Sequence, residues 1–381
     1  MGEKFVCERC GNSDLKYVGY LNGVPYCRKC ITFKSPSVEY VSRKKAKVNY
    51  KLDFALSHEQ EKIALELKTN YINGKNTLLN AVCGAGKTEI VYETISYVLS
   101  GGGRVGFAIP RRDVVIELLP RLQKAFPNQK VIAIYGGHTK TLVGDITLLT
   151  THQLYRFSNY FDLLIIDEID AFPFQNNDLL ETFFKKSIRT NYILMSATPS
   201  EKIIEEFKNE NSHISYLYKR FHNHAIPVPK VLLRPKLLQI YFILKKIKEY
   251  QSKHKPLLIF VPTIGEGEKL LNWLKIFVTS IDLVHSKKEN RDELVTKFKK
   301  REIGILITTS ILERGITIEN LQVIVFMADH TLFNDQNLTQ IAGRVGRKIK
   351  SPTGDVYFLA YELTKAMERS INSINEANKH L

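Results

Sequence analysis

Long hydrophobic runs are missing from this sequence. The apolar runs LLII at 163–166 and LLIFV at 257–261 have the length of core strands, whereas a membrane helix needs about 18–20 apolar residues in succession. The first ten residues, MGEKFVCERC, also lack the apolar segment of a secretory signal. These absences exclude a membrane-spanning or secreted protein and predict a soluble protein in the cytoplasm.

Acidic residues are in the minority. The 381 residues include 39 Asp and Glu against 55 Lys and Arg, which gives a formal net charge of +16. Such an excess favours a polyanionic partner, nucleic acid first and an anionic membrane surface second, although a merely solvated basic surface would also account for it. The hydrophobic fraction of 44% is ordinary for a folded protein and excludes a mostly disordered chain.

Cysteine is scarce except at the amino terminus, where four of the five cysteines lie within thirty residues. They form two Cys-x-x-Cys pairs, which are Cys7 with Cys10 and Cys27 with Cys30. This spacing predicts a zinc ribbon, in which two tight turns aim four thiolates at one tetrahedral ion. Four protein ligands make the site structural. Two disulfides are the alternative, which a cytosolic location disfavours.

The segment between the two cysteine pairs contains Asn22-Gly23, which predicts the turn of a hairpin. Residues 1–50 carry ten basic and four acidic residues, and many of the basic ones lie in the connector at 34–50. Two interpretations stay open at this point. The zinc module contacts nucleic acid, or it is a stabilising appendage.

A phosphate-binding loop is the clearest catalytic signal. The run AVCGAGKT at 81–88 follows a predicted strand at 77–82 and precedes a helix that begins at about Lys87. In such a loop the backbone amides and the helix amino terminus bind phosphate oxygens. Lys87 is expected to bridge the β- and γ-phosphates of ATP, and Thr88 to bind Mg²⁺. The loop residues that would surround the phosphates are Gly84, Ala85 and Gly86.

An acidic pair follows a second apolar run. Four apolar residues at 163–166 predict a buried parallel strand, and Asp167 and Glu168 come directly after it. Ligand sites of such sheets lie at the carboxyl ends of the strands. We expect Asp167 to bind Mg²⁺ and Glu168 to polarise the attacking water. An acidic helix cap is the alternative for Asp167.

A basic motif, QIAGRVGR, lies at 340–347. The spacing of Gln340, Arg344 and Arg347 predicts that they project from one side of a helix. Two arginines three residues apart repel each other unless an anion lies between them, and the γ-phosphate of ATP is such an anion. They are therefore predicted to act as arginine fingers. A solvated basic helix is the alternative, which the two glycines of the motif disfavour.

Taken in order, these motifs resemble those of superfamily-2 helicases over about residues 51–363. The remaining matches are LSHEQ at 56–60, AIPRR at 108–112, LTTHQL at 149–154, SATP at 196–199, IFVPT at 259–263 and TTSILERG at 308–315. The resemblance implies that Gln60 faces the adenine and that Gly315 and Gln340 also contact the nucleotide. It implies six nucleic-acid contacts, namely Arg111, Arg112, Thr151, His152, Thr309 and Arg314. Trp273 is expected in the core, because its apolar neighbours recur at helical spacing.

A narrower resemblance is to the ComFA family of late-competence DNA-uptake ATPases. It rests on the four cysteines together with AVCGAGKTE, PRRDVV, DEIDAFPF, LMSATPS, TTSILERGITI and QIAGRVGRK. It implies an ATP-driven motor on single-stranded DNA that works with proteins of the uptake machinery at the inner face of the membrane. The implied cofactors are ATP, Mg²⁺ and Zn²⁺. An RNA helicase, a primosomal-type DNA helicase and a DNA-binding assembly module with a vestigial ATP site are the alternatives.

The expected fold class is α/β, because apolar strands alternate with helical stretches. The resemblance makes it two tandem RecA-like parallel-sheet domains behind a small zinc ribbon. The expected limits are 1–33 for the zinc module, 34–50 for a basic linker, 51–215 for the ATP-binding domain, 216–232 for a second linker and 233–381 for the carboxyl-terminal domain.

Overall fold

The computed structural model describes residues 5–33, 38–169, 177–220, 222, 224–309, 312 and 318–379. It divides into two compact units. The first comprises the chain up to Ala81 and Gly86–Leu217, and the second comprises Val82–Ala85 and everything from Tyr218 onward. Each unit is described by itself. The domain limits expected from the sequence stay predictions.

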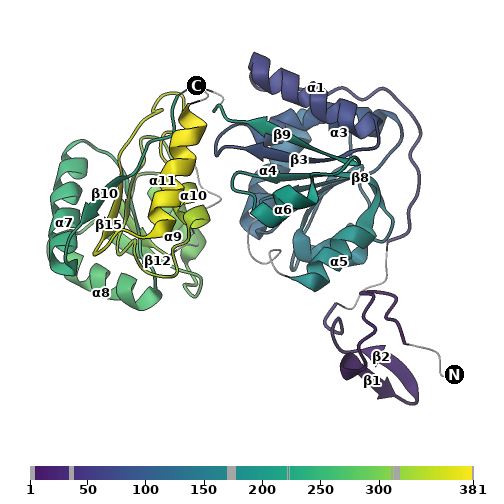
Figure 1. Cartoon of the computed structure of the whole chain (residues 1–381), viewed down its shortest axis with the longest axis horizontal. Coiled ribbons are helices and arrows are strands. Elements are labelled where there is room, and N and C mark those ends of the chain that lie inside the picture. The colour runs from purple at the N-terminus through teal and green to yellow at the C-terminus, as the bar shows by residue number, and fades with distance from the viewer. Residues whose placement is uncertain are drawn as a thin grey trace. The chain divides into compact units, whose positions relative to one another are not determined.

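A two-stranded antiparallel hairpin precedes the first sheet, and it is labelled β1 and β2 in Figure 1. Strand β1 (Val18–Leu21) pairs with β2 (Val24–Cys27), and Leu21 lies opposite Val24. Asn22 and Gly23 both have positive φ angles, 51° and 79°. Two such residues form the turn whose twist matches that of the flanking strands. The predicted hairpin is therefore confirmed.

The first unit is built on a seven-stranded sheet in the order β5-β6-β4-β7-β8-β3-β9, in which all neighbours are parallel. Its strands are β3 (Asn76–Ala81), β4 (Val105–Ile109), β5 (Val131–Ile134), β6 (Ile146–Thr150), β7 (Phe161–Asp167), β8 (Ile188–Ser196) and β9 (Ser212–Leu217). All carboxyl ends of parallel strands lie at one edge, so the loops after β3 and β7 share it.

Helices connect these strands. They are α1 (His58–Ile72), α2 (Lys87–Ile90), α3 (Tyr92–Ser100), α4 (Arg112–Ala125), α5 (Asp178–Ser187) and α6 (Glu201–Glu206). Leu180 and Phe183 of α5 pack in one cluster with Leu164 and Ile166 of β7. Helix α4 packs against β5 and β6. The side chains of Leu163 through Ile166 are all fully buried, as a parallel strand covered on both faces requires.

The segment that follows the cysteine hairpin makes polar contacts with the rest of the first unit. The Tyr40 hydroxyl donates to Asp162 Oδ2 at 3.1 Å, and the Arg189 guanidinium carbon lies 3.6 Å from the centroid of the Tyr40 ring. Arg43 Nε lies 2.6 Å from Asp145 Oδ1. The positive charge of Arg43 is therefore used within the fold.

The second unit has a six-stranded parallel sheet in the order β10-β15-β14-β11-β13-β12. Its strands are β10 (Lys230–Leu233), β11 (Leu257–Phe260), β12 (Ile281–Val284), β13 (Ile305–Thr308), β14 (Gln322–Val325) and β15 (Val356–Ala360). Its helices are α7 (Lys236–Ser252), α8 (Ile264–Leu274), α9 (Arg291–Lys299), α10 (Asp335–Ala342) and α11 (Lys365–Asn378).

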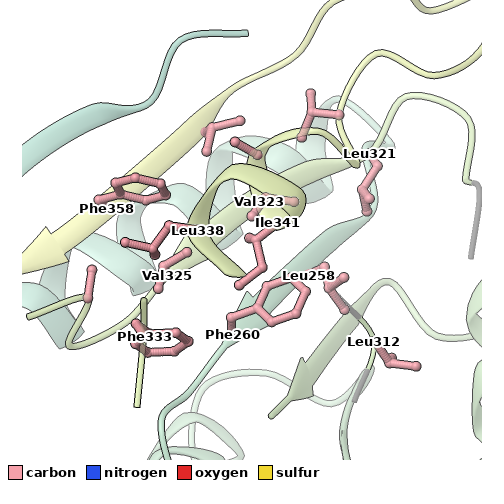
Figure 2. Packing of buried hydrophobic residues seen from close by; sticks show 14 of the residues in the cluster. Leu258, Phe260, Leu312, Leu321, Val323, Val325, Phe333, Leu338, Ile341 and Phe358 are labelled. Carbon is pink, nitrogen blue, oxygen red and sulfur yellow. The ribbon is translucent and has the colours of Figure 1, made fainter. Parts of the chain in front are cut away.

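Alternate residues of these strands enter two separate cores, because successive side chains of a strand point to opposite faces. Leu258 and Phe260 pack with α9, α10 and α11, whereas Leu257 and Ile259 pack with α7 and α8. Figure 2 shows the first of these cores, with Leu338 and Ile341 of α10 beside Val323 and Val325 of β14. The second sheet is therefore covered on both faces.

Two parallel α/β sheets of RecA-like form behind a small cysteine-bearing hairpin confirm the expected fold class. Within the part of the chain that the structure describes, no helix is both long enough and apolar enough to cross a membrane.

Candidate functional site

The four amino-terminal cysteines converge on one point. The sulfur atoms of Cys7 and Cys30 lie 3.6 Å apart, as do those of Cys10 and Cys27, and all four fall within 4.8 Å of one another. A tetrahedral zinc ion with Zn–S bonds of about 2.3 Å separates its sulfur ligands by about 3.8 Å. A disulfide would bring two sulfurs to about 2.05 Å. The residues therefore fit a zinc ion, and all four thiols are free of disulfides.

The surroundings of two of these thiols disfavour their charged, thiolate form unless a cation is bound. Burial raises the pKa of Cys10 and, more strongly, that of Cys30, whose neighbouring thiols act in the same direction. Burial also acts to raise the pKa of Cys7, but hydrogen bonds from the amides of Cys10 and Arg9 outweigh it and leave that pKa lowered. Four thiolates do not coexist here without a compensating positive charge. A bound Zn²⁺ would supply that charge and hold the two turns together.

The module is attached to the first unit through aromatic contacts. The ring of Phe33 lies 5.1 Å from those of both Tyr155 and Phe183. Val38 forms an isolated bridge with Phe157. The metal turns therefore rest on the core that contains α5.

The phosphate loop follows β3, which begins and ends one residue earlier than expected. Gly84 and Gly86 have φ angles of 83° and 78°, in the left-handed region that favours glycine. Helix α2 begins at Lys87 as expected, and Lys87 Nζ donates to the carbonyl of Ala81 at 3.2 Å. The loop thus folds its lysine back over itself, and Thr88 follows in the first turn of the helix.

Gln60 lies against this loop. Its side-chain oxygen accepts from the Ser57 amide at 2.8 Å and so completes the capping box of α1. A Cβ atom on Gly86 would lie 2.6 Å from Gln60 Nε2. Glycine is therefore favoured at 86 by the backbone angle, and the Gln60 side chain lies close beside it. Recognition of adenine by Gln60 stays a prediction.

A neighbouring ion pair was missed by sequence reasoning. Glu89, buried in α2, lies 2.5 Å from Arg121 Nη2 of α4. Glu89 ends the AVCGAGKTE motif, but Arg121 lies 32 positions away outside any recognised motif, so only the fold brings the two residues together.

The acidic pair lies at the carboxyl end of β7, at the same sheet edge as the phosphate loop. Asp167 Oδ1 accepts from the Glu168 amide at 2.9 Å. Glu168 has a φ of 57°, which is uncommon for a residue with a side chain and is typical of functional sites. Nearby, Ser196 Oγ accepts from the Thr198 amide at 2.9 Å. Asp170 and the AFPF segment lie outside the described residues.

The arginine motif of the second unit differs from the prediction. Helix α10 ends at Ala342, and the Gly343 amide closes it by donating to Thr339 at 2.9 Å. Arg344 and Arg347 therefore lie beyond the helix, and the expectation that they share a helical side with Gln340 was wrong. The turn continues through Gly346, whose φ is 70°. A Cβ atom at Gly346 would lie 2.2 Å from the carbonyl oxygen of Pro352.

A buried arginine holds this turn. Arg220 donates to the carbonyl oxygens of Gly343, Val345 and Gly346 at 2.9–3.1 Å. Its side chain is almost fully buried, and burial together with the charge of Arg347 lowers the pKa of Arg220 to about 10. Arg347 Nε also donates to Gly343 at 2.9 Å. Sequence reasoning missed Arg220 because it lies in the connector between motifs.

The expected nucleic-acid contacts fall at several levels of exposure. Arg112 and His152 are exposed, Arg111 and Thr309 are half-buried, and the side chain of Thr151 is fully buried. The hydroxyl of Thr151 is therefore not presented on the surface as the prediction assumed. Arg314 and Gly315 lie outside the described residues.

Trp273 does not lie in the core as expected. It is 39% exposed, and its ring lies 5.2 Å from that of Phe277. Helical spacing placed its neighbours Leu270, Leu271 and Leu274 in the core correctly, but Trp273 itself faces the other way.

Comparisons with known proteins agree with this architecture. The family model described as "Type III restriction enzyme, res subunit" matches residues 53–201, and "Helicase conserved C-terminal domain" matches residues 237–348. The chain is 34% identical to the competence protein ComFA of Bacillus subtilis (strain 168) over 99% of this chain and 86% of that protein. The match to ComFA of Streptococcus pneumoniae is also 34%, over 99% and 91%.

The chain belongs to the ComFA family of competence proteins. It carries superfamily-2 helicase domains that bind ATP, and it is an ATP hydrolase of that superfamily. Among solved structures, the DEAD-box helicase Mss116 bound to single-stranded RNA and UDP-BeF has a TM-score of 0.65 at 18% identity, covering 89% of this chain and 85% of that one. This likeness shows the fold alone.

Proposed function

We propose that this ComFA-family protein is an ATP-driven translocase that moves single-stranded DNA into the cell during natural competence. The observation that carries the proposal is the similarity to two competence proteins along 99% of the chain, combined with a phosphate loop and an acidic pair at one sheet edge. The net charge of +16 supports a polyanionic substrate.

The proposed roles of the ATP-site residues follow from their chemistry. Lys87 and the amides of the loop would bind the phosphates, and Gln60 would contact the adenine. Mg²⁺, held by Thr88 and Asp167, would neutralise phosphate charge. Glu168 would orient the attacking water. Four residues of the second unit would complete nucleotide recognition and stabilise the transition state, namely Gly315, Gln340, Arg344 and Arg347.

The strand would be held mainly by its backbone. The proposed contacts are Arg111, Arg112, His152, Thr309 and Arg314. Thr151 was predicted as a sixth contact, but its side chain is fully buried. Contacts to phosphates make affinity independent of sequence and strongly dependent on salt. We further propose that the chain works at the inner face of the membrane with other uptake proteins, and that Zn²⁺ at the four cysteines is structural.

The test is the rate of ATP hydrolysis with single-stranded DNA, with single-stranded RNA and with neither. We expect DNA to raise the rate well above the other two conditions. Lys87→Ala should abolish turnover, since it removes the positive charge that would bind the β- and γ-phosphates. Lys202→Ala is the matched control, because Lys202 is exposed on α6 and, among the residues that the structure describes, forms an ion pair with Glu206 alone, at 3.9 Å.

Two results would contradict the proposal. Equal or greater stimulation by RNA would favour an RNA helicase. No turnover by the wild type under any condition would favour an assembly module with a vestigial ATP site.

A further inference from the structure

Two rings are stacked at the end of the outermost strand of the first sheet. The rings of Tyr135 and His138 have centroids 4.9 Å apart and planes only 15° from parallel. The turn between them is closed in both directions. The Tyr135 amide donates to the His138 carbonyl at 3.2 Å, and the His138 amide donates to the Tyr135 carbonyl at 2.8 Å. The backbone therefore holds the two rings face to face.

A third planar group joins them from the neighbouring connection. The guanidinium carbon of Arg112, at the start of α4, lies 5.0 Å from the centroid of the Tyr135 ring. Strands β5, β6 and β4 are consecutive in the parallel sheet, so the groups that follow them share one edge. His152, which follows β6, is exposed at this same edge. Planar and cationic groups are thus gathered there.

The two glycines of the turn have no packing role among the described residues. A Cβ atom at Gly136 or Gly137 would meet nothing within 4 Å. Gly137 has a φ of 80° and needs glycine for that reason, whereas Gly136 does not have a positive φ. His138 is exposed and Tyr135 half-buried. The turn is therefore open to solvent, and the missing side chain at 136 leaves room for a ligand beside the rings.

We propose that Tyr135, His138 and Arg112 form a stacking platform for a base of single-stranded DNA. The inference deepens the proposed function and rests on it, because it names the part of the strand that this edge of the first sheet recognises. Bases of any identity stack on aromatic faces, so such a platform adds affinity without sequence preference. The rings are already ordered by the turn, so little side-chain freedom is lost when a base joins them.

The platform predicts a contact that phosphate binding alone does not make. A strand of abasic sites keeps every phosphate of an ordinary strand but has nothing to stack. The wild-type full-length chain should bind an oligothymidylate at least about fivefold more tightly than an abasic strand of the same length and end label. Fluorescence anisotropy at fixed salt measures both affinities.

The variants separate stacking from charge. His138→Ala should lose most of the preference for the base-containing strand and bind the abasic strand as the wild type does. His138→Phe should keep the preference, since it restores an aromatic face. Lys140→Ala, at an exposed position two residues further on, is the control. It should leave the ratio of the two affinities unchanged.

Each other outcome overturns the platform. If His138→Ala keeps the wild-type preference, or weakens binding of both strands equally, the rings do not stack on a base. If the wild type binds both strands equally well, the platform is refuted while the proposed function stands. If the wild type binds neither strand, the proposed function itself fails and the platform with it.

Discussion

The cysteine hairpin and the first sheet differ in how much apolar surface each one buries. In the module, Leu15, Tyr20 and Leu21 are about 70% exposed, while Cys10, Cys27 and Cys30 are buried. In the first sheet the apolar side chains are buried instead of exposed: every residue of β4 is buried, and its side chains are apolar. A segment this small cannot bury enough apolar surface to fold by itself. The proposed zinc ion would make the cysteine hairpin a metal-dependent element, whereas the sheet has an apolar core of its own.

Removing the metal should give the largest difference in stability between the cysteine hairpin and the first sheet. A chelator competes for the ion and Cys10→Ser removes one of its four ligands, so either should reduce zinc from about one ion per chain to none. Binding of structural zinc is coupled to folding, so the hairpin should unfold with the loss. Hydrogen exchange should then show lost protection in β1 and β2 and unchanged protection in β4 and β7. Equal loss in both regions would contradict the comparison.

A cavity in the core of the first sheet should destabilise the sheet and leave zinc binding unchanged. Phe107 of β4 is fully buried, so Phe107→Ala should lower the free energy of unfolding of the first unit by about 3–5 kcal/mol. Chemical denaturation measures this loss, and zinc content should remain that of the wild type. Phe54→Ala, at an exposed site before α1, is the control and should change stability little.

In the second unit a buried arginine, Arg220, holds the turn at 343–346. Arg220→Ala removes three hydrogen bonds to the turn that carries Arg344 and Arg347. We expect kcat for ATP hydrolysis to fall about tenfold or more, since the proposed arginine fingers on this turn would be misplaced and would stabilise the transition state less.

Arg234→Ala is the matched control for Arg220, because Arg234 is exposed on the same unit. Its kcat should equal that of the wild type. A normal kcat in Arg220→Ala would show that the turn does not need its buried arginine.

The smallest effect is expected in the segment that joins the two regions. Tyr40→Phe removes the hydrogen bond to Asp162 but keeps the ring on which Arg189 lies. One such bond contributes about 0.5–1.5 kcal/mol. Thermal unfolding should show a small fall in Tm, and Tyr40→Ala, which also removes the ring, should show a larger one. Identical Tm values in both variants would mean that this segment adds nothing to stability.

Local motifs explain what could be predicted from the sequence. The cysteine pairs, the Asn22-Gly23 turn and the beginning of α2 each depend on residues a few positions apart, so their geometry is fixed locally. The parallel sheets followed from alternating apolar strands and helices, which constrain the topology strongly.

Other features depend on contacts that no local pattern contains. The end of α10 was missed because arginine spacing was weighed above the helix-ending glycine at 343. The arginine at 220 acts on a turn 123 residues away, and the Glu89–Arg121 pair spans two helices. The stacked rings at Tyr135 and His138 give no sequence signal beyond two aromatic residues around a glycine pair.

Displacement of streptavidin from the end of a biotinylated single strand tests the central claim most directly. An ATP-driven translocase on single-stranded DNA should free the biotinylated end from streptavidin at one end of the strand only. The reaction should require ATP hydrolysis and should be lost in Lys87→Ala. If ATP hydrolysis is stimulated by DNA while streptavidin stays bound at both ends, the chain does not move along DNA and the account is contradicted.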